Sequence, residues 1–197
     1  MQEESDENLM IRVKNGDTLA FSILMDRYKQ AVVNLVAYTV GDNIDSEDIA
    51  QHVFIRVYKS AANYEVRSKF TTWLFTITKN LALNEIRRRK RHPTDSLDVV
   101  EQEEDYSKTK QYPDTKAVAP DDSLMNDEMR ECLTAALEEL PERQRLALLM
   151  FQEQGLSYEE ISEILEISLS STKSLIFRAR DTLKKTLKEY LSSESAT

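Results

Sequence analysis

The chain has 197 residues, of which 41% are hydrophobic, and only three glycines and four prolines, which favours an all-α globular protein of one or two small domains. It contains no run of about 18 apolar residues, so no membrane insertion is expected, and its acidic N-terminus is unlike a signal peptide. One cysteine and two histidines exclude an internal disulfide framework and indicate a cytoplasmic protein. They also make a metal site or a Cys–His catalytic pair hard to assemble, and no cofactor is predicted.

The net charge of −9 argues against a nucleic-acid partner, but its distribution argues for one. Basic groups cluster in residues 87–91 and again in residues 168–197, which carry six basic and three acidic groups. Acidic groups dominate the stretch between these two clusters. Because the local field acts on a phosphate, DNA remains a plausible partner.

The first part of the chain predicts three successive helices. Apolar residues recur at helical spacing through residues 8–40, with a break near the Asn-Gly turn at residues 14–17 and a stop at Gly41. The next helix begins at Asp45, the predicted N-cap, with Glu47 and Asp48 in its first turn.

The helix that starts at Asp45 has a candidate interaction face. Its predicted core residues are Ile49, Val53 and Val57. Phe54 lies off this stripe with Glu47 and Gln51, and an exposed Phe beside acid and amide groups is typical of an interface. In the alternative interpretation, the acids stabilise the helix start and Phe54 packs on a neighbour.

A polar connection at residues 62–69 leads into a helix predicted over Phe70–Arg91. Its predicted core stripe is Phe70, Leu74, Ile77 and Leu81. A second strip holds the single Trp with polar and cationic groups: Trp73, Thr76, Asn80, Asn84 and Arg87. This strip and the basic run of residues 87–91 suit bases and phosphates. Alternatively, Trp73 edges the core and the basic run complements the helix C-terminus.

Residues 93–125 lose the helical pattern, with three prolines, many acids and few large apolar residues. They are predicted to form a flexible acidic linker between a domain of residues 1–92 and one of residues 126–197. The alternative is a loop folded over one domain.

The last 70 residues predict a helix-turn-helix. Pro141 marks a helix start and Gly155 a helix end, and Ser157–Glu160 forms a capping box. A short helix over residues 158–165, a turn at residues 166–168 and a longer basic helix over about 169–187 complete the motif. Small and basic side chains on that last helix suit a DNA groove. A helical hairpin with a solvated basic face is the alternative.

These segments resemble one family. LPERQRLALLMFQEQGLSYEEISEILEISLSSTKSLIFRARDTLKK is similar to the sigma-four domain of extracytoplasmic-function RNA polymerase sigma factors of the sigma-70 family. DSEDIAQHVFIRVYKS and KFTTWLFTITKNLALNEIRRRKR, in that order, resemble the sigma-two domain. The resemblance covers roughly residues 8–92 and 126–190.

The resemblance implies an alternative sigma factor, not an enzyme, that binds core RNA polymerase, reads two promoter elements and promotes DNA melting. The implied partners are the β′ clamp helices and the β flap of polymerase, promoter DNA and an anti-sigma factor. The implied polymerase-binding residues are Asp45, Glu47, Asp48, Gln51 and Phe54. Those implied at the minus-ten element are Asn63, Tyr64, Lys69, Trp73, Lys79, Asn80, Asn84, Arg87 and Arg88. Those implied at the minus-thirty-five element are Ser171, Lys173, Ser174, Phe177, Arg178 and Arg180.

The sequence departs from the family at two places. Glu166 stands in the turn where the family often has Gly, and we expect a near-helical turn to tolerate it. Leu175 replaces a cation and Thr172 an apolar residue of the recognition helix. Losing one phosphate contact should reduce the slope of the logarithm of the DNA-binding constant against the logarithm of the salt concentration by about one unit. The rival function is a two-domain helix-turn-helix regulator that acts on duplex DNA without polymerase.

Overall fold

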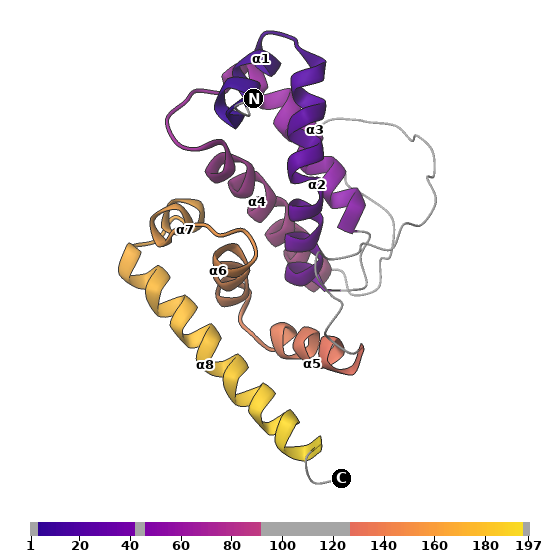
Figure 1. Ribbon diagram of the computed structural model, residues 1–197, viewed down its shortest axis with the longest axis vertical. Coiled ribbons are helices and arrows are strands. Elements are labelled where there is room, and N and C mark those ends of the chain that lie inside the picture. Colours follow the sequence, from indigo (N-terminus) through magenta and orange to yellow (C-terminus); the bar gives the residue numbers. More distant parts are fainter. Residues whose placement is uncertain (1–3, 42–45, 92–126, 195–197) are drawn as a thin grey trace.

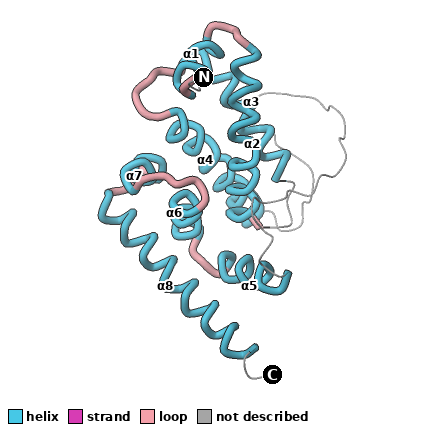
Figure 2. The backbone as a smooth tube through the Cα atoms, in the orientation of Figure 1, coloured by secondary structure: helices cyan, strands magenta, loops and turns pink. Residues whose placement is uncertain are grey.

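The computed structural model describes residues 4–41, 46–91 and 127–194, and these residues form helices joined by turns, with no strand (Figure 2). The elements are α1 (Asp6–Lys14), α2 (Thr18–Val40), α3 (Ser46–Ser60), the short 3-10 helix η1 (Ala61–Asn63), α4 (Phe70–Arg91), α5 (Asp127–Glu138), α6 (Glu142–Gln152), α7 (Tyr158–Leu165) and α8 (Leu169–Glu194). This confirms the all-α fold class. The predicted N-cap Asp45 and the predicted linker lie outside the described residues. Within the described ranges, every helix is too short or too polar to span a bilayer.

Helices α1 to α4 form the first half of the molecule, with α2 packed against α1, α3 and α4 (Figure 1). The predicted break between α1 and α2 is confirmed: the Asp17 carboxylate caps α2 by accepting hydrogen bonds from the Leu19 and Ala20 N–H groups. Gly41 ends α2 with a positive φ of 95°. The turn residues therefore fix both ends of this helix.

Helix α4 has the predicted bounds but a different buried face. Phe70 and Leu74 are fully buried as predicted, whereas Ile77 and Leu81 are only half-buried. The other buried residues are Thr72, Phe75, Thr78, Lys79 and Ala82. The predicted stripe was wrong at its second half because α4 is covered by α2 and α3 on one side and by α7 on another.

The second half carries the predicted helix-turn-helix, α7 and α8, supported by α5 and α6 (Figure 1). The capping box is confirmed, with the Ser157 hydroxyl accepting from the Glu160 N–H and the Glu160 carboxylate from the Ser157 N–H. The expectation of a near-helical turn was wrong. Glu166 is left-handed, with a φ of 55°, a conformation that costs a residue with a Cβ about 1–2 kcal/mol.

The two halves share one buried core. α2 packs against α5 and α6, and α4 packs against α7. Arg145 of α6 is buried at this junction. Its guanidinium donates to Tyr38 O (3.4 Å) and Thr39 O (3.2 Å) near the end of α2, and to Glu138 O (2.9 Å) and Leu140 O (3.2 Å) between α5 and α6. Burial lowers the pKa of Arg145 from its ordinary value.

Replacing Arg145 with Met should destabilise the fold by about 2–4 kcal/mol, because it removes charged donors and leaves buried carbonyl oxygens without partners. The measurement is urea unfolding of the full chain. Arg143→Met, at an exposed position on the same helix, is the matched control and should change the free energy of unfolding by less than about 0.5 kcal/mol. Equal effects of both substitutions would contradict this role for Arg145.

Candidate functional site

An aromatic group lies where the connection between α3 and α4 meets the start of α4. The ring centroids of Tyr64 and Trp73 are 5.1 Å apart, those of Tyr64 and Phe70 are 6.5 Å apart, and those of Phe70 and Trp73 are 6.1 Å apart. Phe70 is fully buried, Tyr64 is buried and Trp73 is half-buried. Trp73 therefore edges the core, as one of the two interpretations predicted, and its half-buried position leaves contact with a base as a prediction.

The connection before α4 is held at both ends by the first helix. The Lys14 ammonium donates to Tyr64 O at 2.9 Å, and the Phe70 N–H donates to the Glu7 carboxylate at 3.0 Å. Burial raises the pKa of Tyr64, and within the described part of the chain its hydroxyl has no hydrogen-bond partner. Tyr64 thus faces inward, whereas Asn63 and Lys69 are exposed at the two ends of the connection.

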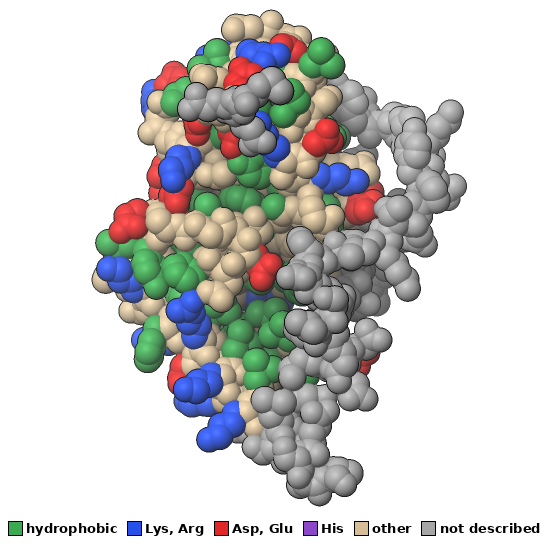
Figure 3. Space-filling model, viewed as in Figure 1, with side chains coloured by type: hydrophobic (Ala, Val, Ile, Leu, Met, Phe, Trp, Pro, Cys, Tyr) green, Lys and Arg blue, Asp and Glu red, His purple; other side chains and the backbone are tan. Residues whose placement is uncertain are grey.

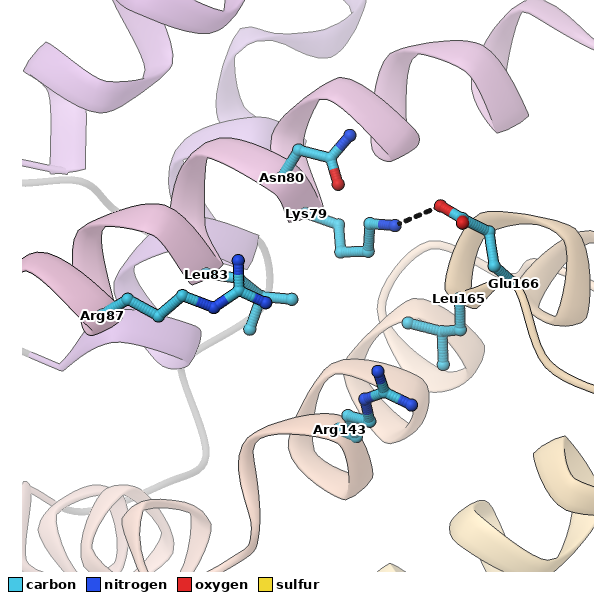
Figure 4. Close-up of a pocket in the computed structure, with 7 residues that line it drawn as sticks. All are labelled: Lys79, Asn80, Leu83, Arg87, Arg143, Leu165 and Glu166. Carbon is cyan, nitrogen blue, oxygen red and sulfur yellow. Dashed lines mark hydrogen bonds and ion pairs between the residues drawn. The ribbon is translucent and has the colours of Figure 1, made fainter. Parts of the chain in front are cut away.

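The second strip of α4 faces outward along the rest of the helix. Asn80, Asn84 and Arg87 are exposed, and the Arg87 guanidinium donates to Asn84 Oδ1 at 3.3 Å. Lys79 differs from these residues: its side chain is only 8% exposed, and its ammonium lies 3.1 Å from the Glu166 carboxylate in the helix-turn-helix turn (Figure 4).

Glu85 pairs with two arginines of the basic run. The sequence analysis did not predict this contact. The Glu85 carboxylate accepts two hydrogen bonds from Arg88, both at 2.9 Å, and one from Arg89 at 3.1 Å. These bonds, with that from Arg88 the largest cause, hold the pKa of Glu85 below its ordinary value. The signal was available, since Glu85 stands three and four residues before these arginines on one helix.

A cavity of about 280 Å³ opens between α4 and the second half (Figure 4). Its lining is mostly cationic or amide: Lys79, Asn80, Leu83, Arg87, Arg143, Leu165 and Glu166. Predicted minus-ten residues thus lie opposite residues of α6 and α7. The sequence could not place them together, because the two segments are separated by more than 50 residues.

Helix α3 presents a different apolar surface from the predicted one. Phe54 is only 5% exposed and packs edge-on against Phe21, with ring centroids 6.5 Å apart. The expectation of an exposed Phe54 was therefore wrong, and the alternative, packing on a neighbour, is correct. Ile55 and Tyr58 are about half exposed instead. They follow the exposed Gln51 at spacings of four and three, so helical periodicity could have found them.

The start of α8 carries two exposed strips. One holds Lys173, Phe177 and Arg180, and the other holds Ser171, Ser174 and Arg178. Lys173 lies over the Tyr158 ring, and Arg180 donates to the Gln152 side chain at 2.6 Å and lies over the Phe151 ring. Phe177, at 72% exposure, stands between these two cations. On the face in Figure 3, Lys and Arg side chains follow the lower-left edge over α8.

Comparison with known proteins identifies the family of the chain. Residues 24–92 match the family Sigma-70 region 2, and residues 130–183 match Sigma-70, region 4. The RNA polymerase sigma-H factor of Pseudomonas aeruginosa is 32% identical over 191 residues, covering 97% of this chain and 98% of that protein. The ECF RNA polymerase sigma-E factor of Escherichia coli K12 is 32% identical over 185 residues, covering 92% and 94%.

The chain belongs to the extracytoplasmic-function group of the sigma-70 family. A solved structure of CnrH in complex with the cytosolic domain of CnrY shares the fold of this sigma factor, with a TM-score of 0.69 and 19% identity over 94% of this chain and 99% of that one. Within this sigma factor, α3 and α4 lie in region 2, and α6, α7 and most of α8 lie in region 4.

The region 4 capping box is expected to respond to pH. Burial opposes ionisation of Glu160, but hydrogen bonds from Ser157 and Lys69 hold its pKa below the ordinary value. The unfolded chain therefore takes up this proton first, so the stabilisation is complete above the unfolded pKa, about 4.3, and is lost as pH falls through the folded pKa. We therefore expect the free energy of unfolding of the unsubstituted chain to exceed that of the Glu160→Gln variant at pH 7, and this difference to shrink as the pH is lowered to 3. A difference that does not change with pH would contradict this contribution of Glu160.

Proposed function

We propose that this chain is an alternative sigma factor that binds core RNA polymerase, recognises two promoter elements and promotes the DNA melting that starts transcription. The main support is that this one chain matches sigma-70 region 2 and then region 4, and that a relative aligns with nearly its whole length. The rival, a regulator acting on duplex DNA alone, would need only the helix-turn-helix. The bond-making groups belong to polymerase, so the chain itself acts as a regulatory subunit in the cytoplasm.

The recognition helix is proposed to read the minus-thirty-five element as a duplex. Serines and cations at the start of α8 are exposed, and side chains of these types hydrogen-bond base edges and phosphates in the major groove. Thr172, at a position that is usually apolar in the family, is fully buried, and its hydroxyl donates to Ser168 O. This departure is therefore accommodated within the helix and leaves the exposed strips unchanged.

The connection before α4 and the outer strip of α4 are proposed to hold the minus-ten strand. Asn63 and Lys69 stand at the ends of the connection, and Asn80, Asn84 and Arg87 continue along α4. The half-buried Trp73, on the same strip of α4, is the aromatic side chain proposed to stack on an unstacked base. Tyr64 supports this surface from the core, because it is buried and its ring packs edge-on against that of Trp73.

The α3 surface is proposed to bind the clamp helices of the polymerase β′ subunit. Exposed Asp48 and Gln51 lie beside Ile55 and Tyr58, which take the apolar role that the sequence assigned to Phe54. A few apolar anchors within a polar rim are typical of a binding hot spot. The flap of the β subunit and an anti-sigma factor are proposed as further partners on the basis of family membership.

The function is tested by run-off transcription with purified core polymerase on a library of fragments from the chain's own genome. We expect initiation only when the chain is present, at sites that share two spaced sequence elements. A chain that binds duplex DNA but neither binds core polymerase nor directs initiation would support the rival instead.

The α3 surface is tested by Ile55→Glu, which should lower affinity for core polymerase at least about tenfold, equivalent to about 1.4 kcal/mol. The residue is 47% exposed, so stability should change by no more than about 0.5 kcal/mol. Ile11→Glu on α1, 41% exposed, is the matched control and should bind as the unsubstituted chain does. Core affinity is measured by titrating labelled protein with core polymerase, and equal losses in both variants would refute the assignment.

A further inference from the structure

The connection between η1 and α4, residues 64–69, is anchored at both ends by one helix. At its first residue, the Lys14 ammonium donates to Tyr64 O at 2.9 Å. Just past its last residue, the Phe70 N–H donates to the Glu7 carboxylate at 3.0 Å. Both partners lie on α1, which packs against η1 and α4 (Figure 1). The first helix therefore sets where the connection begins and where it ends.

The two anchored ends of the connection lie close together. The ring centroids of Tyr64 and Phe70 are 6.5 Å apart, and both rings are buried. The chain between these residues could span roughly 20 Å if it were fully extended. The connection thus has more length than it needs to join its ends, so its middle bows outward. Residues 65–67 are exposed accordingly.

Helix α1 is fixed to the rest of the first half by its buried face and by polar contacts. The Asp6 carboxylate pairs with Arg27 at 2.6 Å and accepts a hydrogen bond from the Tyr28 hydroxyl. The buried residues of α1 are Leu9, Met10 and Val13. The two anchors therefore hold the connection against the folded core. The match to Sigma-70 region 2 begins at residue 24, so it assigns no role to α1.

The Glu7 carboxylate also completes the start of α4. The first N–H groups of a helix have no partner within the helix and form the positive end of its dipole, so a carboxylate is a favourable partner. The Phe70 N–H is one of these groups. The Trp73 ring packs against the rings of Tyr64 and Phe70, which are the two residues that α1 anchors. The anchors therefore also fix the surroundings of Trp73.

We propose that α1 is a positioning element of the minus-ten site, in which Glu7 and Lys14 hold the connection and Trp73 in the geometry that receives the strand. The inference rests on the proposed function, because it takes residues 63–69 and Trp73 as the strand site. Glu7 and Lys14 act through the two backbone groups that they hold, without touching DNA. A connection that is ordered beforehand loses less conformational entropy on binding, so its anchors raise the affinity for the strand.

A purely structural role of α1 has different consequences. If Glu7 and Lys14 only stabilised the fold, their substitution would lower the free energy of unfolding, and the folded variants would bind the strand as before. If the two residues position the site, the folded variants bind the strand more weakly and still bind core polymerase. Strand affinity measured beside core affinity therefore separates the two roles.

The experiment uses the full chain and the emission of Trp73, its single Trp, which reports this site alone. The binding probe is a single-stranded DNA pool of random sequence, and a base that stacks on the ring quenches the emission. For Glu7→Ala and for Lys14→Met we expect about three- to tenfold weaker strand binding. Glu7→Gln keeps an acceptor for the Phe70 N–H and Lys14→Arg keeps a donor, so both should stay within about twofold of the unsubstituted chain.

The matched controls are Asp26→Ala and Lys29→Met, which change the net charge equally at exposed positions of α2. Both controls should bind the strand as the unsubstituted chain does. Affinity for core polymerase is measured for every variant and should not change. Urea unfolding verifies that each variant is folded under the conditions of the titration.

Unchanged strand binding in Glu7→Ala and Lys14→Met would overturn the proposal, and so would equal losses in the two controls. A parallel loss of core affinity, or a Glu7→Gln variant as weak as Glu7→Ala, would also overturn it. Absence of quenching in the unsubstituted chain would do the same, since Trp73 would then not be a strand site.

Core-dependent run-off transcription by the unsubstituted chain is measured in parallel with the titrations. Failure of that assay would refute the proposed function. Initiation by the unsubstituted chain, combined with unchanged strand binding in Glu7→Ala and Lys14→Met, would refute the role of α1 alone.

Discussion

The arrangement of the two halves depends on the burial of one guanidinium. Arg145 places its charge among carbonyl oxygens at the end of α2 and between α5 and α6, where each helix end leaves acceptors that its own backbone cannot pair. These bonds fix α6 against α2, and the shared core then continues from one half into the other. A buried guanidinium cannot move far. If it lost one of these carbonyl acceptors, an N–H group of the charged side chain would stay buried without a hydrogen bond, which is unfavourable.

The surfaces that this arrangement brings together are complementary in charge. Lysines of the first half pair with carboxylates of the second, while the exposed strips at the start of α8 carry cations. The net charge of −9 is therefore a poor guide to the partners of this sigma factor. Three acids of the second half pair with lysines of the first, and the field at the recognition helix is set by nearby Lys and Arg residues.

Sequence periodicity predicted most of the fold but misassigned residues at contacts between elements. The bounds of α4 and α7 were predicted, since capping residues and apolar spacing are local signals. Phe54 was expected to be exposed, yet it packs on Phe21 of α2. Ile77 was expected to be in the core, yet it is half-buried and the neighbouring Thr78 is fully buried. Both errors have one cause: periodicity identifies an apolar face but cannot show how many neighbours cover the helix.

The sequence by itself determined the all-α class, the helix-turn-helix with its capping box, and the family, because these depend on local residue patterns and on the order of motifs along the chain. Only the tertiary structure could show that Lys79 is buried and that Glu166 is left-handed and reaches α4, whereas helical spacing alone could have predicted the contact between Glu85 and Arg88. Glu85 and Arg88 are close in sequence, but Lys79 and Glu166 are 87 residues apart. Their pairing exists only because a shared core and a buried Arg145 bring two distant segments within reach of an ion pair.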